Sequence, residues 1–574
     1  MSTAETPVYE WNDLDWHAIE RRVFKLQTRI YRASRRGDVK SVHRLQRLLM
    51  VSWSARCVAV RRVSQDNRGK KTAGVAGVKN LAPAQRFHLA TILRLTPTAH
   101  PTRRVWIPKP GNPTERRGLG MPTLFDRARQ ALAKLLLAPE WEARFEPHSD
   151  GFRPGRSAHD AIEAIFLQLS RKPKYVFDAD IAKCFDRIDQ TALLNKLQTI
   201  PRLRRAIKAW LKAGVMDGLD LTPTEQGTPQ GGVASPLLAS IALHGLETAV
   251  RDAVPHTHKV NGKTVDPWQP VVIRYADDLV ILHEDEGVIR QVQQITADWL
   301  AGMGLALKPS KTRITHTLHP YEGQVGFDFL GVHIQQFPVG RTHTGTNGPG
   351  TPLGFKTIIT PSKDAQHRHQ HALGVLIRRA QSLPHADRIE RLNLVICGWV
   401  NYDATVASKQ VFAKMHALLF AKLLRWAKRR HPHKPIDWVT KTYWRREKGS
   451  WAFEVKNGPM LHPHYRKPIR RHIKVRDDKS VYDGDWVYGA SRLGRHPELP
   501  REVAQLLKRQ AGKCAWCGLS FRADDVMERD HLVPTSDGGD ERLGNRQLLH
   551  GHCHDEKTAR DGSYAGGGTR DKGH

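Results

Sequence analysis

A pair of adjacent carboxylates between two short apolar runs constrains the fold of this chain more than any other feature. The run Val271-Val272-Ile273 precedes the sequence YADD at 275–278, and a second apolar run follows at 279–282. This pattern predicts a strand, a tight polar turn and a second strand. Two carboxylates at the tip of a hairpin repel each other unless a cation neutralises them. We therefore expect Asp277 and Asp278 to bind a metal ion.

A third carboxylate stands at the end of another predicted strand. Residues 175–177 are apolar or aromatic and lead through Asp178 to Asp180. If Asp180 lies beside the 277–278 pair, the three carboxylates would hold two Mg²⁺ ions. The carbonyl oxygen of Ile181 would add a further ligand. Phosphoryl transfer uses such pairs of ions, about 3.5–4 Å apart, to hold the attacking and leaving oxygens.

Two segments supply candidate walls for a nucleotide site. Phe185, five residues after Asp180, would form a floor under the incoming sugar, and its ring would exclude a 2′-hydroxyl group. The glycine-rich segment 226–233 lets a nucleotide approach the backbone closely. Gln230 in this segment would pack on the sugar or the base.

Basic residues supply candidate partners for a triphosphate. Arg103, Lys109 and Arg117 lie in two predicted strands and the turn between them. These cations would either clamp the triphosphate, whose charge must be neutralised for in-line attack, or form a solvated basic surface. Lys311 would contact the triphosphate or protonate the departing pyrophosphate.

The composition indicates a polyanionic partner. The 574 residues contain 91 Lys and Arg against 57 Asp and Glu, which gives a formal net charge of +34. Such a charge attracts nucleic acids, which release counterions on binding. A charged surface that serves only solubility is the alternative. We expect no membrane partner, because no apolar run is long enough for a transmembrane helix and the acidic start is unlike a secretory signal.

Cysteine and histidine residues near the C-terminus have the spacing of a zinc site. Cys514 and Cys517 form one pair, and Cys553 forms a second pair with either His550 or His552. We favour His550, because its two-residue gap to Cys553 matches the gap in the first pair. Four such ligands make a closed structural Zn²⁺ site. The clustering of the cysteines fits metal binding in a reducing compartment better than it fits a disulfide framework. We therefore expect a cytoplasmic protein.

Five motifs occur in a fixed order along the chain. They are GFRPGRS at 151–157, the Asp180 segment at 180–186, GTPQGG at 227–232, YADD at 275–278 and FDFLG at 327–331. In this order they resemble the reverse transcriptase of bacterial group II introns. The resemblance implies a right-hand polymerase that copies RNA into DNA, using Mg²⁺ and deoxynucleoside triphosphates (dNTPs).

The segment between the two zinc pairs resembles an HNH endonuclease, which has a ββα-metal fold. The sequence ERDHLVP at 528–534 carries this resemblance. By that resemblance His531 is the general base that activates water, and Asn545 orients it. Asp530 and His554 would hold one divalent ion that stabilises the leaving oxygen. A zinc knuckle that only grips nucleic acid is the alternative.

The resemblance covers nearly the whole chain and implies a multidomain α+β fold. The motifs CGWVNY at 397–402 and LRWAKRRHP at 424–432 are similar to that family's helical thumb or maturase domain. The implied order is an RNA-binding extension of the fingers (1–85), fingers and palm (86–337), a flexible insertion or linker (338–354), thumb or maturase domain (355–446), a basic DNA-binding region (447–500), the HNH domain (501–562) and a disordered tail (563–574).

Together these resemblances imply a protein that binds its group II intron RNA, assists splicing and supports intron mobility. The HNH domain would nick target DNA, and the polymerase would extend the new 3′ end. The expected nucleic-acid contacts are Arg425, Lys428, Arg429, Arg430, Arg466, Lys467, Arg470 and Arg471. Two alternatives are an RNA chaperone that splices an immobile intron and a reverse transcriptase recruited to host defence.

Overall fold

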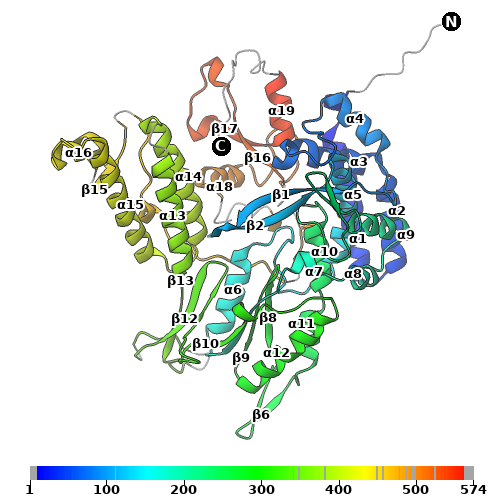
Figure 1. Ribbon diagram of the computed structural model, residues 1–574, viewed down its shortest axis with the longest axis horizontal. Coiled ribbons are helices and arrows are strands. Elements are labelled where there is room, and N and C mark those ends of the chain that lie inside the picture. Colours follow the sequence, from blue (N-terminus) through cyan, green and yellow to red (C-terminus); the bar gives the residue numbers. More distant parts are fainter. Residues whose placement is uncertain are drawn as a thin grey trace.

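The computed structural model describes residues 10–560 with several internal gaps (Figure 1). The gaps are residues 110–111, 341, 347–349, 380–382, 448–449, 456–457, 478, 486–487, 490–491, 493–498 and 522–524. The expected tail at 563–574 lies outside the described residues. Among the helices that are described, none has an apolar stretch long enough to cross a membrane.

Helices make up the N-terminal part of the molecule, coloured blue in Figure 1. They are α1 (Trp16–Arg35), α2 (Val39–Val51), α3 (Trp53–Arg61), the π-helical turn η2 (Arg62–Asp66) and α4 (Pro83–Ile92), with short turns at Trp11–Asp13 and Arg68–Lys71. Asp15, Asp38 and Ser52 begin the first three helices by accepting hydrogen bonds from backbone N–H groups.

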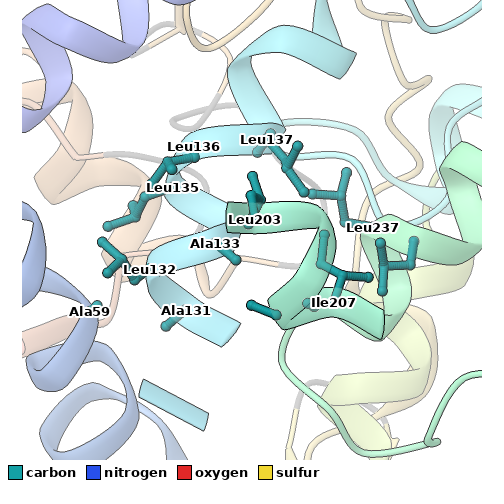
Figure 2. Close-up of a cluster of buried hydrophobic side chains, with 14 of the residues drawn as sticks. Ala59, Ala131, Leu132, Ala133, Leu135, Leu136, Leu137, Leu203, Ile207 and Leu237 are labelled. Atoms are coloured by element: carbon teal, nitrogen blue, oxygen red, sulfur yellow. The ribbon is translucent and has the colours of Figure 1, made fainter. Parts of the chain in front are cut away.

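Helix α5 (Leu124–Glu142) is the centre of the largest hydrophobic core (Figure 2). Its Ala and Leu side chains are buried on nearly every face. Ala59 of α3 packs on one side, and Leu203 of α9 (Pro201–Leu211) and Leu237 of α10 (Ser235–Leu243) pack on the other. Charged residues of the helix, such as Asp126 and Glu142, are buried as well, so other elements enclose it on nearly every side. The core therefore joins the N-terminal helices to α9 and α10.

Two sheets flank this core. The first has the order β2-β1-β4-β5 and contains the hairpin of the basic candidates. Its strands are β1 (Thr102–Lys109), β2 (Asn112–Met121), β4 (Val215–Asp217) and β5 (Asp220–Thr222). The second has the order β10-β3-β9-β8, and each neighbouring pair is antiparallel. Its strands are β10 (Arg313–His316), β3 (Tyr175–Asp180), β9 (Asp278–His283) and β8 (Val271–Tyr275).

The second sheet is covered on both faces, which explains why its inner strand β9 is apolar throughout 279–282. Val280 and Leu282 of β9 pack with α6 (Ala158–Leu169). The alternate residues Leu279 and Ile281 pack with α11 (Leu246–Asp252) and α12 (Glu286–Ala301). Shorter elements surround it: α7 (Cys184–Arg187), α8 (Gln190–Leu197), β6 (His258–Val260), β7 (Lys263–Val265) and the turn η4 (Pro309–Lys311).

A three-stranded sheet leads to the thumb. It consists of β11 (Phe327–Phe329), β12 (Val332–Pro338) and β13 (Phe355–Pro361), in that order. The interval 338–354, expected to be an insertion or linker, joins β12 to its antiparallel neighbour β13. In its described part, the backbone N–H of Leu353 donates to the carbonyl of Gly345 at 2.9 Å. This interval is thus the loop of a hairpin within one sheet.

The region expected to be the thumb or maturase domain is a bundle of helices on the left of Figure 1. It contains α13 (Lys363–Arg379), α14 (His385–Asp403), α15 (Lys409–Arg430), α16 (Ile436–Tyr443), the hairpin β14 (Trp444–Glu447) and β15 (Ser450–Phe453), and the turn η5 (His464–Arg466). Its hydrophobic core is separate from that of the fingers. The C-terminal unit contains α18 (Arg501–Arg509), β16 (Met527–His531), turns at Thr535–Asp537 and Leu543–Asn545, β17 (Arg546–His550) and α19 (Gly551–Arg560). These elements confirm the predicted multidomain α+β fold.

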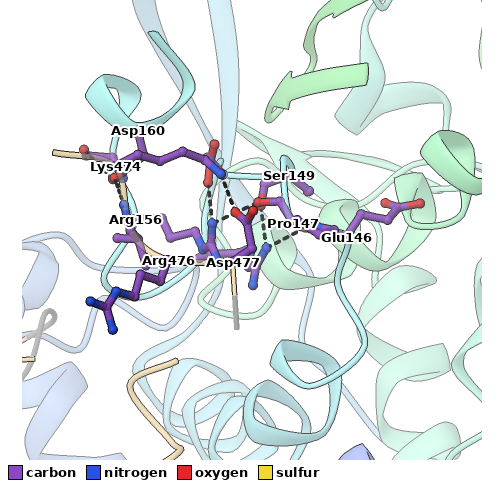
Figure 3. A network of polar contacts seen from close by, with 12 residues as sticks. Glu146, Pro147, Ser149, Arg156, Asp160, Lys474, Arg476 and Asp477 are labelled. Atoms are coloured by element: carbon purple, nitrogen blue, oxygen red, sulfur yellow. Dashed lines mark hydrogen bonds and ion pairs between the residues drawn. The ribbon is translucent and has the colours of Figure 1, made fainter. Parts of the chain in front are cut away.

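Between these two units the chain crosses back over the palm. We call residues 470–485 the strap. Asp160, at the start of α6, accepts hydrogen bonds from the His472 ring at 3.0 Å, from the backbone N–H of Val475 at 2.8 Å and from Arg492 at 3.0 Å. Figure 3 shows Asp160, Lys474 and neighbouring charged residues in one polar network. These partners hold the pKa of Asp160 well below its usual value, despite burial.

Candidate functional sites

Two neighbouring strands bring three carboxylates together. Strands β3 and β9 run antiparallel, and Asp180 is the direct register partner of Asp278. Asp277 stands just before β9, and its carbonyl accepts the backbone N–H of Ile181 at 3.4 Å. Directly opposed residues in such a pair have Cβ atoms about 4.5–5.5 Å apart. The structure therefore places Asp180 beside the 277–278 pair, where the sequence predicted it.

The surroundings of these carboxylates favour a bound cation. Burial raises the pKa of Asp277, and the charge of Asp180 raises it further. Burial and the charges of Asp277 and Asp180 raise the pKa of Asp278 to about 6. Buried carboxylates that repel one another gain free energy when a divalent cation binds between them. Their hard oxygen ligands fit Mg²⁺.

Lys311 already supplies a positive charge at this place. Its Nζ donates to Oδ2 of Asp180 at 2.6 Å from the turn η4. The Lys311 side chain is 58% exposed and that of Asp180 is 17% exposed, so the ammonium group reaches in from the solvent side. The backbone N–H of Lys308 donates to the Asp180 carbonyl at 2.8 Å, which ties this turn to β3.

Four segments far apart in the sequence form one wall beside the carboxylates. The ring of Phe185 meets the ring of Phe152 edge to face, with centroids 5.7 Å apart. The Phe185 carbonyl accepts the backbone N–H of Thr228 at 2.6 Å, and the Gln230 carbonyl accepts that of Gly120 at 2.7 Å. The glycine-rich segment thus lies between α7 and β2.

The structure separates the three basic candidates of the β1–β2 hairpin. The charge of Arg117 lowers the pKa of Asp277, so Arg117 lies within electrostatic range of the carboxylates. Arg103 is exposed on β1 opposite Met121. The side chain of Lys109 lies outside the described residues.

A second backbone segment supports the turn that carries Asp277. Ala276 has a φ of 58°, and a Cβ atom on Gly151 would lie 2.1 Å from its nitrogen. The guanidinium of Arg274 donates to the Ala276 carbonyl at 3.2 Å and to Oγ of Ser149 at 2.6 Å. Sequence reasoning assigned no role to Arg274. The available signal was a charged residue inside an otherwise apolar strand.

Three thiols and one imidazole meet in the C-terminal unit. The ligand atoms of Cys514, Cys517, His550 and Cys553 all lie within 4.8 Å of one another. His550 belongs to this group and His552 does not, as the spacing indicated. Three cysteines and a histidine in this arrangement fit a tetrahedral structural Zn²⁺ site.

The hairpin β16–β17 and helix α19 form a ββα unit beside the thiols. Oδ1 of Asp530 on β16 lies 3.8 Å from Nε2 of His554 on α19, so these two residues can share one divalent ion. Nε2 of His531 lies 3.3 Å from a carboxylate oxygen of Glu541. His531 ends β16, one residue beyond Asp530, as expected for a base next to a metal ligand.

Asn545 was expected to orient His531, and the structure shows how it contacts the loop between them. Its side chain accepts the N–H of Val533 at 2.9 Å and donates to the carbonyls of Val533 at 3.0 Å and Asp540 at 2.8 Å. Its backbone carbonyl accepts the N–H of Leu532 at 2.8 Å. Within the described part of the chain, its hydrogen bonds thus fix the backbone that follows His531.

Comparison with known proteins agrees with this geometry. Family models match for the N-terminal domain of reverse transcriptase (residues 11–93), reverse transcriptase (RNA-dependent DNA polymerase) (107–334), the maturase-specific domain of group II introns (366–444) and HNH endonuclease (514–560). Protein YkfC of Escherichia coli is 32% identical over 332 residues, which are 50% of this chain and 82% of YkfC. The chain belongs to the group II intron-encoded proteins.

Two further relatives carry related names. The group II intron-encoded protein LtrA of Lactococcus lactis is 38% identical over 154 residues, 26% of this chain and 25% of LtrA. Maturase-like protein 1 of Euglena gracilis is 29% identical over 241 residues, 40% of this chain and 51% of the relative. This intron-encoded protein therefore carries an RNA-dependent DNA polymerase domain, a maturase domain and an HNH endonuclease domain.

The HNH domain of this intron-encoded protein contains two polar residues that sequence reasoning missed. Gln547 donates to Oδ2 of Asp530 at 2.8 Å, and Nζ of Lys557 lies 3.2 Å from the same oxygen. Lys557 also donates to the carbonyl of His531 at 3.0 Å. Gln547 follows from the register of β16 against β17, and Lys557 stands one helical turn after His554.

The expected nucleic-acid contacts fall into two groups in the maturase domain and the strap. Arg425, Lys428, Arg429 and Arg430 are exposed on α15, and Arg466 and Arg470 are exposed beyond it. Lys467 instead donates to the Asn401 side chain at 2.6 Å. The Arg471 guanidinium lies 3.5 Å from the centroid of the Phe166 ring. Arg471 thus holds the strap against α6, and Lys467 holds the segment just before the strap against α14.

Proposed function

We propose that this intron-encoded protein binds its own intron RNA, assists splicing and makes the intron mobile. In mobility, the HNH domain nicks one strand of target DNA, and the polymerase copies intron RNA from the new 3′ end. The observation that supports this most directly is the register of Asp180 against Asp278 in a chain that also carries the ββα unit. We place the reaction in the cytoplasm, because the clustered thiols suit a reducing compartment.

The polymerase residues would act on charge and position. Two Mg²⁺ ions, held by Asp180, Asp277, Asp278 and the Ile181 carbonyl, would supply activation of the 3′-hydroxyl and stabilisation of pyrophosphate. Phe185 and Gln230 would hold the dNTP sugar. Lys311 would move from Asp180 to the phosphates as the carboxylates take their metal ligand role, and Arg117 would add a second cation.

The nuclease residues would act on a water molecule and a phosphodiester. His531 would accept the water proton at its ring nitrogen, and Glu541, 3.3 Å away, would stabilise the resulting imidazolium. Asp530 and His554 would hold one divalent ion that supplies charge stabilisation at the leaving oxygen. Zn²⁺ at the four-ligand group would be structural.

The maturase domain and fingers would bind RNA through phosphates and shape. The exposed cations of α15 lie on its last turns, where a nucleic-acid backbone can reach several of them at once. The basic region 447–500 would contact target DNA. The chain's excess of cations supports both contacts.

A single substitution tests the polymerase assignment. Asp277→Ala removes one metal ligand, so we expect loss of primer extension on an RNA template with RNA binding unchanged. Asp364→Ala, at a carboxylate that is 71% exposed, is the matched control and should extend normally. Full extension by Asp277→Ala would remove the assignment.

Mobility is tested separately. His531→Ala should abolish second-strand nicking and leave splicing normal. An RNA chaperone would promote splicing with or without the substitution, but it would neither nick DNA nor copy RNA into DNA. A defence enzyme would copy RNA without promoting splicing of an intron.

A further inference from the structure

The end of the HNH domain that carries the three cysteines and His550 packs against the N-terminal helices. The ring of His552, near the start of α19, lies 6.2 Å from the ring of Trp16 at the start of α1, measured between centroids. His552 is only 8% exposed and stacks on the zinc ligand candidate His550, with centroids 5.2 Å apart. Figure 1 shows α19 beside the blue helices.

Charged residues reinforce this contact. The guanidinium of Arg61 lies 4.5 Å from the Trp16 ring centroid and forms ion pairs with Glu20 and, at 3.3 Å, with Asp66. Arg61 is 3% exposed. The charge of Asp525 in the HNH domain also raises the pKa of Arg61. We call Trp16, Glu20, Arg61 and Asp66 the seat.

Beside the seat lies a cavity of about 780 Å³ that reaches from the nuclease to the palm. Met527 at the start of β16, Arg62 next to the seat and Phe152 all line it. Phe152 is the residue whose ring meets Phe185 at the nucleotide wall. Two carboxylates line it, Asp66 and Asp485, and Asp485 pairs with Lys479 at 2.8 Å. The cationic lining residues outnumber them and are Arg62, Lys134, Arg153, Arg156, Lys479 and Arg492.

One of these cations has unused hydrogen-bonding capacity. Arg156 donates through one nitrogen to Asp150 at 3.0 Å and to the Pro147 carbonyl at 2.9 Å. Its side chain is 2% exposed, and its Nε and second terminal nitrogen have no hydrogen-bond partner within the described residues. Unused donors beside a basic cavity favour an anionic ligand. The cavity also offers aromatic rings, Tyr482, Tyr488 and Phe521, on which bases can stack.

We propose that the seat holds the HNH domain in a fixed position relative to the polymerase, with His552 as the positioning residue, and that the nicked DNA strand crosses the cavity to the palm. The proposal rests on the proposed function, because the crossing strand is the primer. Because the distance between the two active sites is fixed, capture of the nicked 3′ end by the polymerase is intramolecular. This end is therefore extended in preference to competing 3′ ends in solution. The ligand class is an unpaired polynucleotide strand.

The seat is tested without any activity, by hydrogen exchange on the full chain. His552→Arg places a second cation beside buried Arg61, so we expect faster amide exchange, by about tenfold, in 16–24 and 551–556. His552→Phe keeps a ring and should exchange like the natural protein. Zinc content should be equal in all three. Trp16→Ala changes the other partner of this contact and should speed amide exchange in α19. Unchanged exchange in α19 in that variant would contradict the proposed seat.

The crossing strand is tested by a competition assay. The natural protein receives duplex target, template RNA and excess unlabelled primer, offered as DNA in one arm and RNA in another. The His552→Arg variant should nick DNA, and it should extend added primer within about twofold of the natural rate. When competing DNA primer is present, it should extend the 3′ ends that it has itself nicked about tenfold less often than the natural protein does. Lys479→Ala should show the same loss with normal exchange. Undiminished extension of own nicks in both variants overturns the crossing.

These outcomes separate the two proposals. If the natural protein neither nicks nor extends, the proposed function fails, while the exchange result still decides the seat. If RNA alone competes, the cavity takes an RNA strand and the primer route is overturned.

Discussion

A Cβ atom on Gly151 would lie 2.1 Å from the backbone nitrogen of Ala276, well inside any real contact. The loop before α6 and the turn that carries Asp277 therefore meet backbone to backbone. Arg274 joins the same two segments through Ser149 and the Ala276 carbonyl. The position of the carboxylates thus depends on a glycine distant in sequence.

Gly151→Ala should displace the turn, because neither backbone can yield without losing its hydrogen bonds. We expect primer extension to fall about 100-fold, the cost of misplacing catalytic groups by about 1 Å. Steady-state extension assays on an RNA template measure this. Gly398→Ala is the control: an added Cβ at Gly398, inside α14, meets nothing within 4 Å and should be neutral or stabilising by about 1 kcal/mol. Normal extension by Gly151→Ala would contradict the close contact.

Lys311→Ala should weaken dNTP binding, because the ammonium group is the cation nearest Asp180. We expect the KM for dNTP to rise about tenfold, equivalent to about 1.4 kcal/mol, with RNA binding unchanged. Lys172→Ala removes a similarly exposed lysine that pairs with Glu284 and serves as the control. Equal KM values for the two variants would assign Lys311 a purely structural role.

Zinc binding should distinguish the two histidines near Cys553. His550→Ala removes one of the four clustered ligands and should lower the zinc content well below one ion per chain. His552→Ala leaves all four ligands and should keep the ion. Elemental analysis of the purified variants measures both. Zinc loss in His552→Ala with retention in His550→Ala would reverse the ligand choice.

Asp403 should make stability fall as pH rises. Burial raises its pKa from 3.8 to about 7, and its carboxylate oxygens have no hydrogen-bond partner among the described residues. Between pH 4 and 7 the folded protein holds a proton that the unfolded chain releases. The stability contributed by this proton is present at low pH and lost as pH rises through 7.

At pH 8 the Asp403→Asn variant should therefore unfold at a higher temperature than the natural protein. Its free energy of unfolding should be larger by about 2–4 kcal/mol. The difference should shrink toward pH 4. Thermal unfolding followed by circular dichroism measures it. The exposed Asp437→Asn should show no such pH dependence. A constant difference across pH would contradict the buried charge.

Local patterns were enough to predict the carboxylate cluster and the zinc group. Asp180 ends one apolar strand and Asp278 begins another, so in an antiparallel pair both carboxylates lie at the same edge of the sheet. His550 followed from two-residue spacing. The catalytic roles of these residues remain predictions.

Contacts between distant segments could not be predicted from local pattern. The bonds of Asn545 depend on how the loop 532–545 folds, and those of Asp160 on residues more than 300 positions away. The sequence of the strap shows only a basic and irregular pattern, because the conformation of this segment is set by its contacts with residues of the palm. The seat likewise depends on Trp16 and His552, which no sequence period connects.

The strap also limits how such a protein can lose its nuclease through evolution. Asp160 is 1% exposed, and its side-chain partners His472 and Arg492 lie after the thumb. A shortened descendant ending with the maturase domain would lose these cationic partners and keep only the hydrogen bonds from Ser157 to Asp160. Viable nuclease-free descendants should therefore either retain the strap or replace Asp160 with a neutral residue.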